Sequence, residues 1–435
     1  MKKTMGILAL VLALALCGAA AAEVRITFWH SMSEQAGVLM DEFVQEFNDT
    51  LGREQGIVVE AIFQGKYSDA VTKMNSILSA GQDETLPDVM QIDATGKVAF
   101  AAAPTAYTVD MARADHPEDD LSQLLAPAMQ NWSLAGRQLG LPFATSTTVT
   151  YYNRTALEAA GIPAPDTLAD VAAMAGKLPA TGENGQAIDI YASVPNTPTL
   201  ANWLGQLGSD LVDEKNGTEG TATKLDCIDN GALAAFLTQW KALYASGALA
   251  NNSGSTDAFV AGQQLIMTAS TSSVASLLGK IGDRFELGVA PYLRVSAESG
   301  KGATVSGSCL VMFGQDEARR AAAWSFVRYL TGAQVQARLA AGTGYLPSNL
   351  DAAQSEAWTA LIEKTPQYAV GLTQLQETPE EMRSVTVGPS ADFYYGIMNA
   401  ISDMLESDLT PEETVEIMQD DLGGLLEQYQ RANEG

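Results

Sequence analysis

Two runs of consecutive hydroxyl side chains are the first residues in this sequence that could bind a ligand. Residues 145–148 (TSTT) lie within the stretch 136–153, whose β-branched and aromatic residues favour a strand. Residues 270–273 (STSS) follow an apolar strand predicted at 265–268. Because hydroxyl groups are costly to bury without hydrogen-bond partners, we expect the first run to face a wet cleft between two lobes. The alternative is an ordinary strand with a threonine-rich edge.

The residues that usually carry catalysis are few or wrongly spaced. The chain has 2 histidines: His30 stands at a predicted strand end and His116 in an acidic loop. Neither a Ser-x-x-Lys nor a Gly-x-Ser-x-Gly motif occurs, and the spacings of His and Cys metal sites and of a phosphate-binding P-loop are missing. We therefore expect no enzyme, no cofactor and no metal. The alternative is a secreted glycoside hydrolase acting on sugars, for which Asp93 is the one acid that we place at the cleft.

Length and charge restrict the partners. A chain of 435 residues with 46% hydrophobic and 18% charged residues is long enough for two folded lobes or more. Its formal net charge of -27 disfavours binding to nucleic acid or to an anionic membrane surface. No stretch after the N-terminus is apolar over 18 residues, so no membrane-spanning helix is expected.

The N-terminus has the pattern of a secretion signal, which we assign to residues 1–22. Two lysines precede an apolar core at 6–16, and three alanines at 20–22 suit cleavage before Glu23. We expect a secreted, periplasmic protein; lipid attachment at Cys17, which would hold it on the outer face of the cell membrane, is the alternative. Cys227 and Cys309 then remain, either as one disulfide or as two buried thiols.

Strands alternate with helices in the first hundred residues. Strands are predicted at 24–30, 57–63 and 88–92, and helices at 33–48 and 68–80. The first helix should bury the apolar face formed by Val38, Leu39, Phe43, Val44 and Phe47. This alternation predicts parallel strands, whose carboxyl ends usually hold the ligand. The turns at that edge are 29–31, 65–67 and 93–95.

Three segments, near 146, 306 and 345, resemble crossings between lobes. A chain that crosses three times forms a hinged clamp. We therefore predict an α/β fold with two lobes, each a mostly parallel sheet flanked by helices. Lobe 1 would comprise 23–145 plus 308–343, and lobe 2 would comprise 147–305 plus 346–435.

Short motifs in these segments, in this order, resemble the extracellular solute-binding proteins of bacterial ABC importers, of the carbohydrate type. The general motifs are 86–89 (LPDV), 140–142 (GLP), 151–153 (YYN), 259–262 (FVAG), 323–326 (AWSF) and 344–347 (GYLP). Within the family, residues 28–32 (FWHSM), 65–67 (GKY) and 268–270 (TAS) are most similar to the glycerol-3-phosphate-binding members. The resemblance implies a small-molecule ligand, a membrane permease as partner, no chemistry on the ligand and a monomer.

The resemblance also implies ligand contacts, at Tyr67, Ser146, Ser270, Gly307 and Tyr345. All of them fall in segments that we place at the cleft from the sequence pattern.

Three family positions differ in this sequence. The family's acidic contact falls on Ala94, beside Asp93, and its phosphate-contacting arginine falls on Tyr394. A cleft tryptophan is replaced by Gln206, with Trp203 nearby. We therefore add Asp93, Trp203 and Tyr394 to the candidate site and leave the ligand open between a glycerophosphate or its diester and a sugar. If phosphate binds, Lys66 and Arg383 are the candidate cations.

Overall fold

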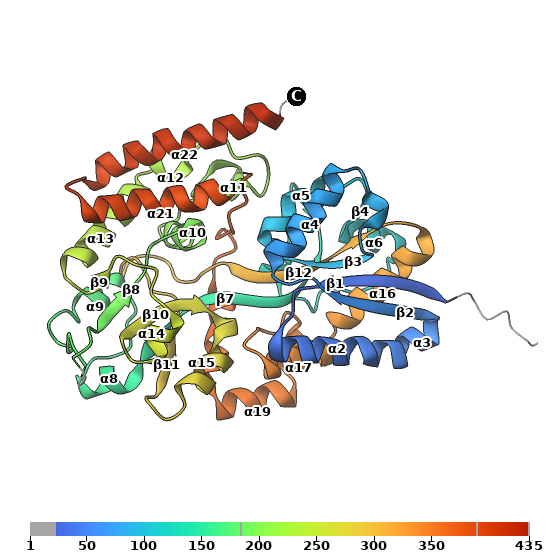
Figure 1. Ribbon diagram of the computed structural model, residues 1–435, viewed down its shortest axis with the longest axis horizontal. Coiled ribbons are helices and arrows are strands. Elements are labelled where there is room, and N and C mark those ends of the chain that lie inside the picture. Colours follow the sequence, from blue (N-terminus) through green and yellow to red (C-terminus); the bar gives the residue numbers. More distant parts are fainter. Residues whose placement is uncertain (1–22, 183–184, 389, 434–435) are drawn as a thin grey trace, which may run out of the picture.

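The computed structural model describes residues 23–182, 185–388 and 390–433 (Figure 1). The predicted signal peptide, residues 1–22, and the alternative lipid site at Cys17 lie outside the described residues. No helix of the described part combines the length and the apolar character that crossing a membrane requires.

One mixed sheet runs through the molecule, and its neighbouring strands follow the order β2-β1-β3-β12-β7-β10-β8-β9. Beside this path, β4 pairs with β12 and β11 pairs with β7, and a separate hairpin is formed by β5 and β6. The strand bounds are β1 Val24–His30, β2 Ile57–Phe63, β3 Val89–Ile92, β4 Ala106–Tyr107, β5 Ser133–Leu134, β6 Arg137–Gln138, β7 Leu141–Asn153, β8 Asp189–Ala192, β9 Leu249–Ala250, β10 Gln264–Ser270, β11 Leu287–Ala290 and β12 Val305–Phe313.

The expected parallel pairing is present at both ends of the sheet. Strand β1 is parallel to β2 and β3, and β8 is parallel to β9 and β10. The sheet as a whole is mixed because the central strands β7 and β12 run antiparallel to the strands they pair with. The α/β prediction is confirmed, and the antiparallel pairs belong to the strands that cross between the two ends.

Helices cover both faces of the sheet. In Figure 1, α4 and α5 lie above β1 and β3 and α2 lies below, while α21 and α22 lie together over the other end. The first half of the chain contains α2 Glu34–Asp49, α3 Leu51–Gln55, α4 Tyr67–Ser79, α5 Lys97–Ala102, α6 Val109–Asp115, α7 Ala126–Asn131, α8 Arg154–Ala159, α9 Leu168–Ala172, α10 Thr197–Gln206 and α11 Asp213–Gly217. The second half contains α12 Asp226–Asp229, α13 Ala232–Ala245, α14 Thr256–Val260, α15 Val274–Ile281, α16 Glu317–Leu330, α17 Ala333–Gly342, α18 Leu350–Ala353, α19 Glu356–Lys364, α20 Ala369–Glu377, α21 Ser390–Glu406 and α22 Pro411–Asn433.

Helix α2 shows how hydrophobic spacing positions an element. Its buried residues include Leu39, Phe43 and Phe47, which recur every four residues and face the core below the sheet. Met40 is fully buried as well, whereas Val38, which we expected on the same face, is 53% exposed. The helix is rotated slightly from the predicted orientation, so that Met40 takes the place of Val38 in the core.

Apolar cores lie at both ends of the sheet and a further one lies between them. One core surrounds Phe28 and Phe326, and another surrounds Trp203 and Phe236. The core between them mixes Val149 with residues from both predicted lobes, such as Leu125 and Leu346. The proposed division into 23–145 plus 308–343 and 147–305 plus 346–435 stays a prediction.

Candidate functional site

The three predicted crossing segments meet at Thr145. In the antiparallel pairing of β7 with β12, Thr145 lies opposite Gly307. On its other side it bridges Leu346, whose backbone N–H donates to the Thr145 carbonyl oxygen at 2.7 Å. The first half of β7 pairs with β12, and its second half, from Thr148 onward, pairs with β10 and β11. Strand β7 therefore crosses the middle of the molecule, as Figure 1 shows.

Gly307 is a position where only glycine fits. Its φ of 101° is in the range that residues with a side chain rarely adopt, and an added Cβ would lie 1.9 Å from the carbonyl oxygen of Ala144. The register of β12 against β7 shifts between Gly307 and Cys309, which is a β-bulge. The two crossing strands can therefore approach closely and expose backbone at this point.

Only part of the hydroxyl run of β7 faces the cleft, which corrects our expectation that the whole run does. Thr145 and Thr147 are 0% exposed, and the Thr147 hydroxyl donates to the carbonyl oxygens of Ala303 and Thr304 at 3.2 and 3.0 Å. Their side chains point away from the cleft because alternate residues of a strand face opposite sides. Ser146 is 3% exposed, and its hydroxyl lies 3.2 Å from that of Ser306.

A cluster of bonded polar side chains, which we call the tyrosine cluster, consists of Tyr67, Gln91, Ser308 and Tyr345. The Gln91 amide is fully buried and donates to the Tyr67 hydroxyl at 3.1 Å and to the Ser308 hydroxyl at 2.8 Å. Burial, and next the neighbouring Tyr345, hold the pKa of Tyr67 well above its ordinary value. Burial also raises the pKa of Tyr345. The structure thus brings together two predicted contacts, Tyr67 and Tyr345, as neutral hydroxyls.

A cavity of about 210 Å³ lies beside the crossing strands. It is lined by Asp93, Ala94, Asn131, Trp132, Thr148, Thr197, Pro198, Ala201, Asn202, Thr304, Val305, Ser306, Gly307, Ser384 and Val385. Of the predicted site residues, it contains Asp93 and Gly307. Asp93 is its only carboxylate, and one of its oxygens accepts from the Thr95 backbone N–H at 3.1 Å. A pair of acids, as glycoside hydrolysis requires, is absent from this lining.

Three of the lining residues carry a buried polar atom without a hydrogen-bond partner in the described part of the chain. They are Asn131, through Oδ1; Trp132, through Nε1; and Thr197, through Oγ1. We call these three residues the open cluster. An unpartnered buried polar group costs about 1–3 kcal/mol, so we take these three residues as candidates for contact with a ligand.

Helix α10 brings its N-terminus to this cavity. Asn196 and Thr199 form a reciprocal capping box, which starts the helix directly before Thr197. The Asn196 amide also donates to the Tyr394 hydroxyl at 3.1 Å. Tyr394 is half-buried and is not among the lining residues, so the structure joins it to the helix cap rather than to the cavity wall.

Trp203 is not a cleft residue, which corrects our prediction. It is 0% exposed, its ring stacks on Phe236 and Tyr292 at 5.1 and 5.2 Å, and its indole N–H donates to the Leu293 carbonyl oxygen at 3.0 Å. The reason is helical position: Trp203 shares the core-facing side of α10 with Leu200. Gln206 is likewise 3% exposed and bonds backbone groups.

Ser270 ends β10 and caps the turn that follows it. Its hydroxyl accepts from the Ser272 backbone N–H at 3.2 Å and lies 2.9 Å from the Ser272 hydroxyl. In the β10–β7 pairing, Ser270 lies opposite Thr148, which lines the cavity. Ser270 thus lies near the crossing strands, but its hydroxyl bonds to Ser272 in its own turn.

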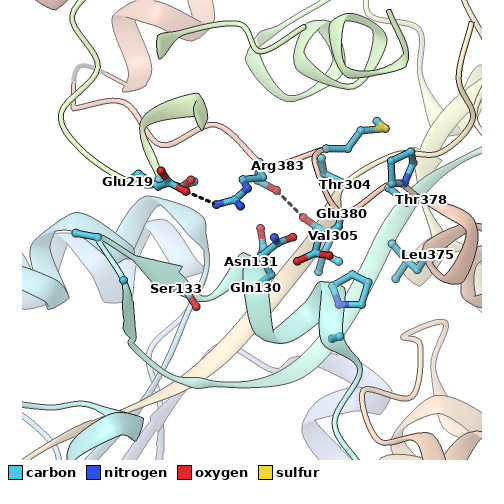
Figure 2. Close-up of a pocket in the computed structure, with 18 residues that line it drawn as sticks. Gln130, Asn131, Ser133, Glu219, Thr304, Val305, Leu375, Thr378, Glu380 and Arg383 are labelled. Atoms are coloured by element: carbon cyan, nitrogen blue, oxygen red, sulfur yellow. Dashed lines mark hydrogen bonds and ion pairs between the residues drawn. The ribbon is translucent and has the colours of Figure 1, made fainter. Parts of the chain in front are cut away.

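A larger cavity of about 510 Å³ adjoins the first and shares Asn131, Thr304, Val305 and Ser384 with it (Figure 2). Arg383 reaches across this cavity to Glu219 at 3.2 Å. Lys66 is exposed at the start of α4. Neither predicted cation lines the smaller cavity.

Sequence reasoning did not single out Lys97, a buried lysine near the smaller cavity in sequence but not among the residues that line it. It is 1% exposed, and its ammonium donates to the Thr386 hydroxyl at 3.2 Å. Its position, four residues after Asp93 in a turn that we had placed at the ligand edge, was the available signal.

Cys227 and Cys309 are free and buried in different cores, so the disulfide alternative is wrong. Burial raises the pKa of the Cys227 thiol to about 12 and that of Cys309 well above its ordinary value.

Comparisons with known proteins agree with this geometry. The sn-glycerol-3-phosphate-binding periplasmic protein UgpB of Yersinia pestis bv. Antiqua (strain Antiqua) is 25% identical over 370 residues, which cover 83% of this chain and 82% of the relative. The structure of UgpB from Mycobacterium tuberculosis in complex with glycerophosphocholine matches with a TM-score of 0.75 at 20% identity, covering 93% of this chain and 99% of that one.

A cyclic alpha-maltosyl-1,6-maltose binding protein from Arthrobacter globiformis matches with a TM-score of 0.76 at 18% identity, covering 94% of this chain and 100% of that one. At such low identity these two structures support the two-lobed fold. The family model described as "Bacterial extracellular solute-binding protein" matches residues 42–366, well over half of the 435 residues. With the crossing strands and the cavity beside them, this match shows that the chain belongs to the family of bacterial extracellular solute-binding proteins.

Proposed function

We propose that this chain is the binding protein of an ABC importer, which captures a glycerol-3-phosphate or glycerophosphodiester ligand and delivers it to a membrane permease. The observation that carries the proposal is the open cluster beside the 210 Å³ cavity. A ligand with several hydroxyl and phosphate oxygens would supply the missing partners of Asn131, Trp132 and Thr197. A purely apolar ligand would leave them unpaired.

The size and lining of the cavity favour a small polar ligand over an oligosaccharide. Its volume of about 210 Å³ is below the ~300–1,000 Å³ of typical drug-sized ligand sites. Trp132 is the only aromatic residue in its lining, and the two residues that we had considered for stacking on a sugar, Trp203 and Tyr394, do not line it. The ligand named for the Yersinia relative and the one named for the Mycobacterium structure both contain a glycerophosphate.

A neutral sugar is the second candidate ligand. Asp93 and Asn202 line the cavity, and such side chains bind sugar hydroxyls through hydrogen bonds. The Arthrobacter protein, which is named for binding a cyclic maltose-type sugar, has the same fold. This candidate needs the larger neighbouring cavity to join the first, because an oligosaccharide exceeds the space beside the crossing strands.

The proposed cycle consists of binding and release, without chemistry on the ligand. The two lobes would close about the crossing segments at Thr145, and the closed form would dock on the permease as a monomer. Export to the periplasm is proposed from the signal pattern at 1–22, with lipid attachment at Cys17 as the alternative.

Calorimetric titration of the chain from Glu23 onward tests the proposal. We expect micromolar affinity for glycerol-3-phosphate or glycerophosphocholine and weaker or no binding of maltose. At a ligand concentration of 100 times Kd, the free energy of unfolding should rise by about 2.7 kcal/mol. If maltose binds and neither phosphate compound does, the proposed ligand changes from a glycerophosphate to a sugar. Turnover of a chromogenic glycoside that is lost in Asp93→Asn would instead support the hydrolase alternative.

A further inference from the structure

The tip of the β5–β6 hairpin contacts a distant part of the chain. Its two-residue loop consists of Ala135 and Gly136, whose φ angles of 49° and 72° belong to the left-handed region that such hairpin loops use. The Ala135 backbone N–H donates to the carbonyl oxygen of Thr218 at 2.8 Å. Ala135 belongs to predicted lobe 1 and Thr218 to predicted lobe 2, so this hydrogen bond joins the lobes outside the crossing segments.

Thr218 directly follows residues 214–217 of α11, which we call the left-handed turn. The φ angles of Glu214, Lys215 and Asn216 are 52°, 50° and 57°, and that of Gly217 is 71°. Residues with a side chain rarely adopt this conformation, and three in succession cost folding free energy. Such strain persists only where the surrounding structure holds it, and it is frequent at functional sites. The left-handed turn therefore calls for a functional explanation.

Asn216 joins the left-handed turn to residues 383–386. Its side-chain amide donates to the Arg383 carbonyl oxygen at 3.0 Å, and its own carbonyl oxygen accepts from the Thr386 backbone N–H at 2.8 Å. Its side-chain oxygen accepts from the Leu211 backbone N–H at 2.7 Å. At Gly217, an added Cβ would lie 2.0 Å from the Thr386 carbonyl oxygen. These contacts hold the turn and residues 383–386 together as one unit of predicted lobe 2.

A second hydrogen bond joins this unit to predicted lobe 1. The ammonium of Lys97 donates to the Thr386 hydroxyl at 3.2 Å, and Lys97 is 1% exposed. Residues 93–94, shortly before Lys97, and residues 384–385, just before Thr386, line the smaller cavity from both sides. The contact between the lobes therefore lies beside this cavity, and parting the lobes there would break both hydrogen bonds.

The contact is not packed like a core. A cavity of about 180 Å³ remains in it, lined by Leu134 and Ala135 on the hairpin side and by Gly217, Gly220 and Thr386 on the other. Protein interiors contain few voids larger than a water molecule. The Lys97 ammonium, which donates here to a neutral hydroxyl, would gain water as a partner if the contact opened. Both features suit two surfaces that meet and part.

We propose that the hairpin tip and the left-handed turn form a latch between the lobes. The latch favours the closed arrangement even without ligand, and it must open whenever a ligand enters or leaves the cavity. The hydrogen bonds from Ala135 and Lys97 break on opening, while Asn216 keeps the turn and residues 383–386 together on lobe 2. This inference rests on the proposed function, because it requires lobes that close about a ligand, and it adds the contact that holds them closed.

The first test joins the two sides of the latch covalently in the double variant Ala135→Cys, Thr218→Cys. The natural thiols, Cys227 and Cys309, are buried and leave the new pair to react. We expect the oxidised protein to take up and release glycerol-3-phosphate at least about tenfold more slowly than the same protein after reduction, because the disulfide prevents the hinge motion. Stopped-flow fluorescence measures both rates, with Trp132 in the cavity wall as a reporter.

The control is Thr181→Cys, Ala187→Cys, a bridged pair of exposed residues within predicted lobe 2. Its oxidation should leave both rates unchanged. If the directions of the side chains prevent the disulfide at the latch, a short bis-maleimide joins the same two thiols. Ligand exchange at equal rates in the joined and the free latch variant would overturn the inference.

The second test needs no ligand. Thr386→Val removes the hydroxyl to which Lys97 donates, and Thr238→Val, its control, removes a hydroxyl that bonds the Ala234 carbonyl oxygen within α13. In solution scattering of the free proteins, Thr386→Val should have a larger radius of gyration than the wild type, since the latch is weakened. Thr238→Val should match the wild type. An unchanged radius in Thr386→Val would count against the inference.

The two failures can be told apart. If the wild type binds neither glycerol-3-phosphate nor glycerophosphocholine, the proposed ligand fails, and the scattering comparison still decides on the latch. If it binds them and the joined latch exchanges ligand as fast as the free one, the proposed function stands and only the latch is lost.

Discussion

The tyrosine cluster and the open cluster lie in the central region of the molecule near β12 but differ in their hydrogen bonds. In the first, the Gln91 amide bonds Tyr67 and Ser308, and its carbonyl oxygen accepts from the Ser31 backbone N–H at 3.0 Å. In the second, Asn131, Trp132 and Thr197 each have a buried polar atom without a partner among the described residues. A bonded network stabilises the folded state without ligand, whereas an unbonded one makes it less stable until a ligand arrives.

This difference predicts which substitutions affect stability and which affect binding. Changes in the tyrosine cluster should lower the free energy of unfolding, because they leave buried groups unpaired. Changes in the open cluster should leave stability nearly unchanged and weaken ligand binding, because the groups that they remove have no partner among the described residues.

The largest effect is expected for Gly307→Ala in β12, the strand that carries Ser308 of the tyrosine cluster and lines the smaller cavity. The added Cβ would meet the Ala144 carbonyl oxygen at 1.9 Å, at a backbone conformation unsuited to alanine. Overpacking and backbone strain together should lower the free energy of unfolding by about 4 kcal/mol, measured by urea denaturation. The control is Gly279→Ala in α15, where an added Cβ meets nothing within 4 Å and helix propensity predicts a gain of up to about 1 kcal/mol. Similar stability of the two variants would contradict our account of the crossing.

The next effect is expected for Gln91→Leu, which removes the centre of the tyrosine cluster. The Ser31 N–H and the Tyr67 and Ser308 hydroxyls would lose their partner, so we expect a loss of about 3 kcal/mol in the free energy of unfolding. The control is Met90→Leu on the same strand, a volume-conserving change at a fully buried apolar site that should cost less than about 1.5 kcal/mol. If both variants lose the same free energy of unfolding, the hydrogen bonds of the tyrosine cluster are not what stabilises this region.

Trp132→Phe removes the unpartnered indole N–H of the open cluster. Trp240→Phe is a matched control, because Trp240 is also fully buried with an unpartnered Nε1 but lies in the core around Trp203, away from the cavity. We expect similar thermal stability for the two variants and about tenfold weaker glycerol-3-phosphate binding for Trp132→Phe only, since a hydrogen bond to a charged group contributes about 1.5–3 kcal/mol. Equal affinities would show that the ligand does not bond Trp132.

The smallest effect is expected for Thr197→Val at the start of α10. The Thr150 hydroxyl in β7 is also buried without a partner among the residues that the structure describes, and it lies outside the cavity lining, so Thr150→Val is the control. Both changes should alter the free energy of unfolding by no more than about 1 kcal/mol, because neither removes an existing hydrogen bond. Only Thr197→Val should weaken glycerol-3-phosphate binding, by about fivefold, in calorimetric titration. A greater loss of affinity in Thr150→Val would exclude Thr197 as a ligand contact.

The order of elements was predictable from local pattern. Strand β2 has the predicted bounds 57–63, and α2 begins within one residue of the predicted start. The crossings near 146, 306 and 345 were also predicted, because glycine breaks and strand-forming residues mark them locally. Tyr67 and Tyr345 could both be placed at the cleft, because the turn at 65–67 and the break at 344–347 were assigned to it and the resemblance implied both tyrosines as contacts.

The errors concern the direction of side chains. Trp203 is two turns into α10 and faces the core, and two of the four hydroxyls at 145–148 alternate away from the cleft. A disulfide between Cys227 and Cys309 was open in the sequence, since separation along the chain does not say that the two thiols lie in different cores. Each of these depends on which face of an element the neighbouring elements cover.

The sequence by itself determined the succession of strands and helices, the three crossings and the family, because these depend on local propensity, glycine positions and short motifs. Only the tertiary structure decided that Lys97 is buried against Thr386, 289 positions away, and that three polar atoms beside one cavity lack partners within the described part of the chain. The physical reason is that burial and hydrogen-bond pairing are properties of the assembled chain. A lysine in a short helix has the same local pattern whether its ammonium reaches solvent or a buried hydroxyl far along the chain.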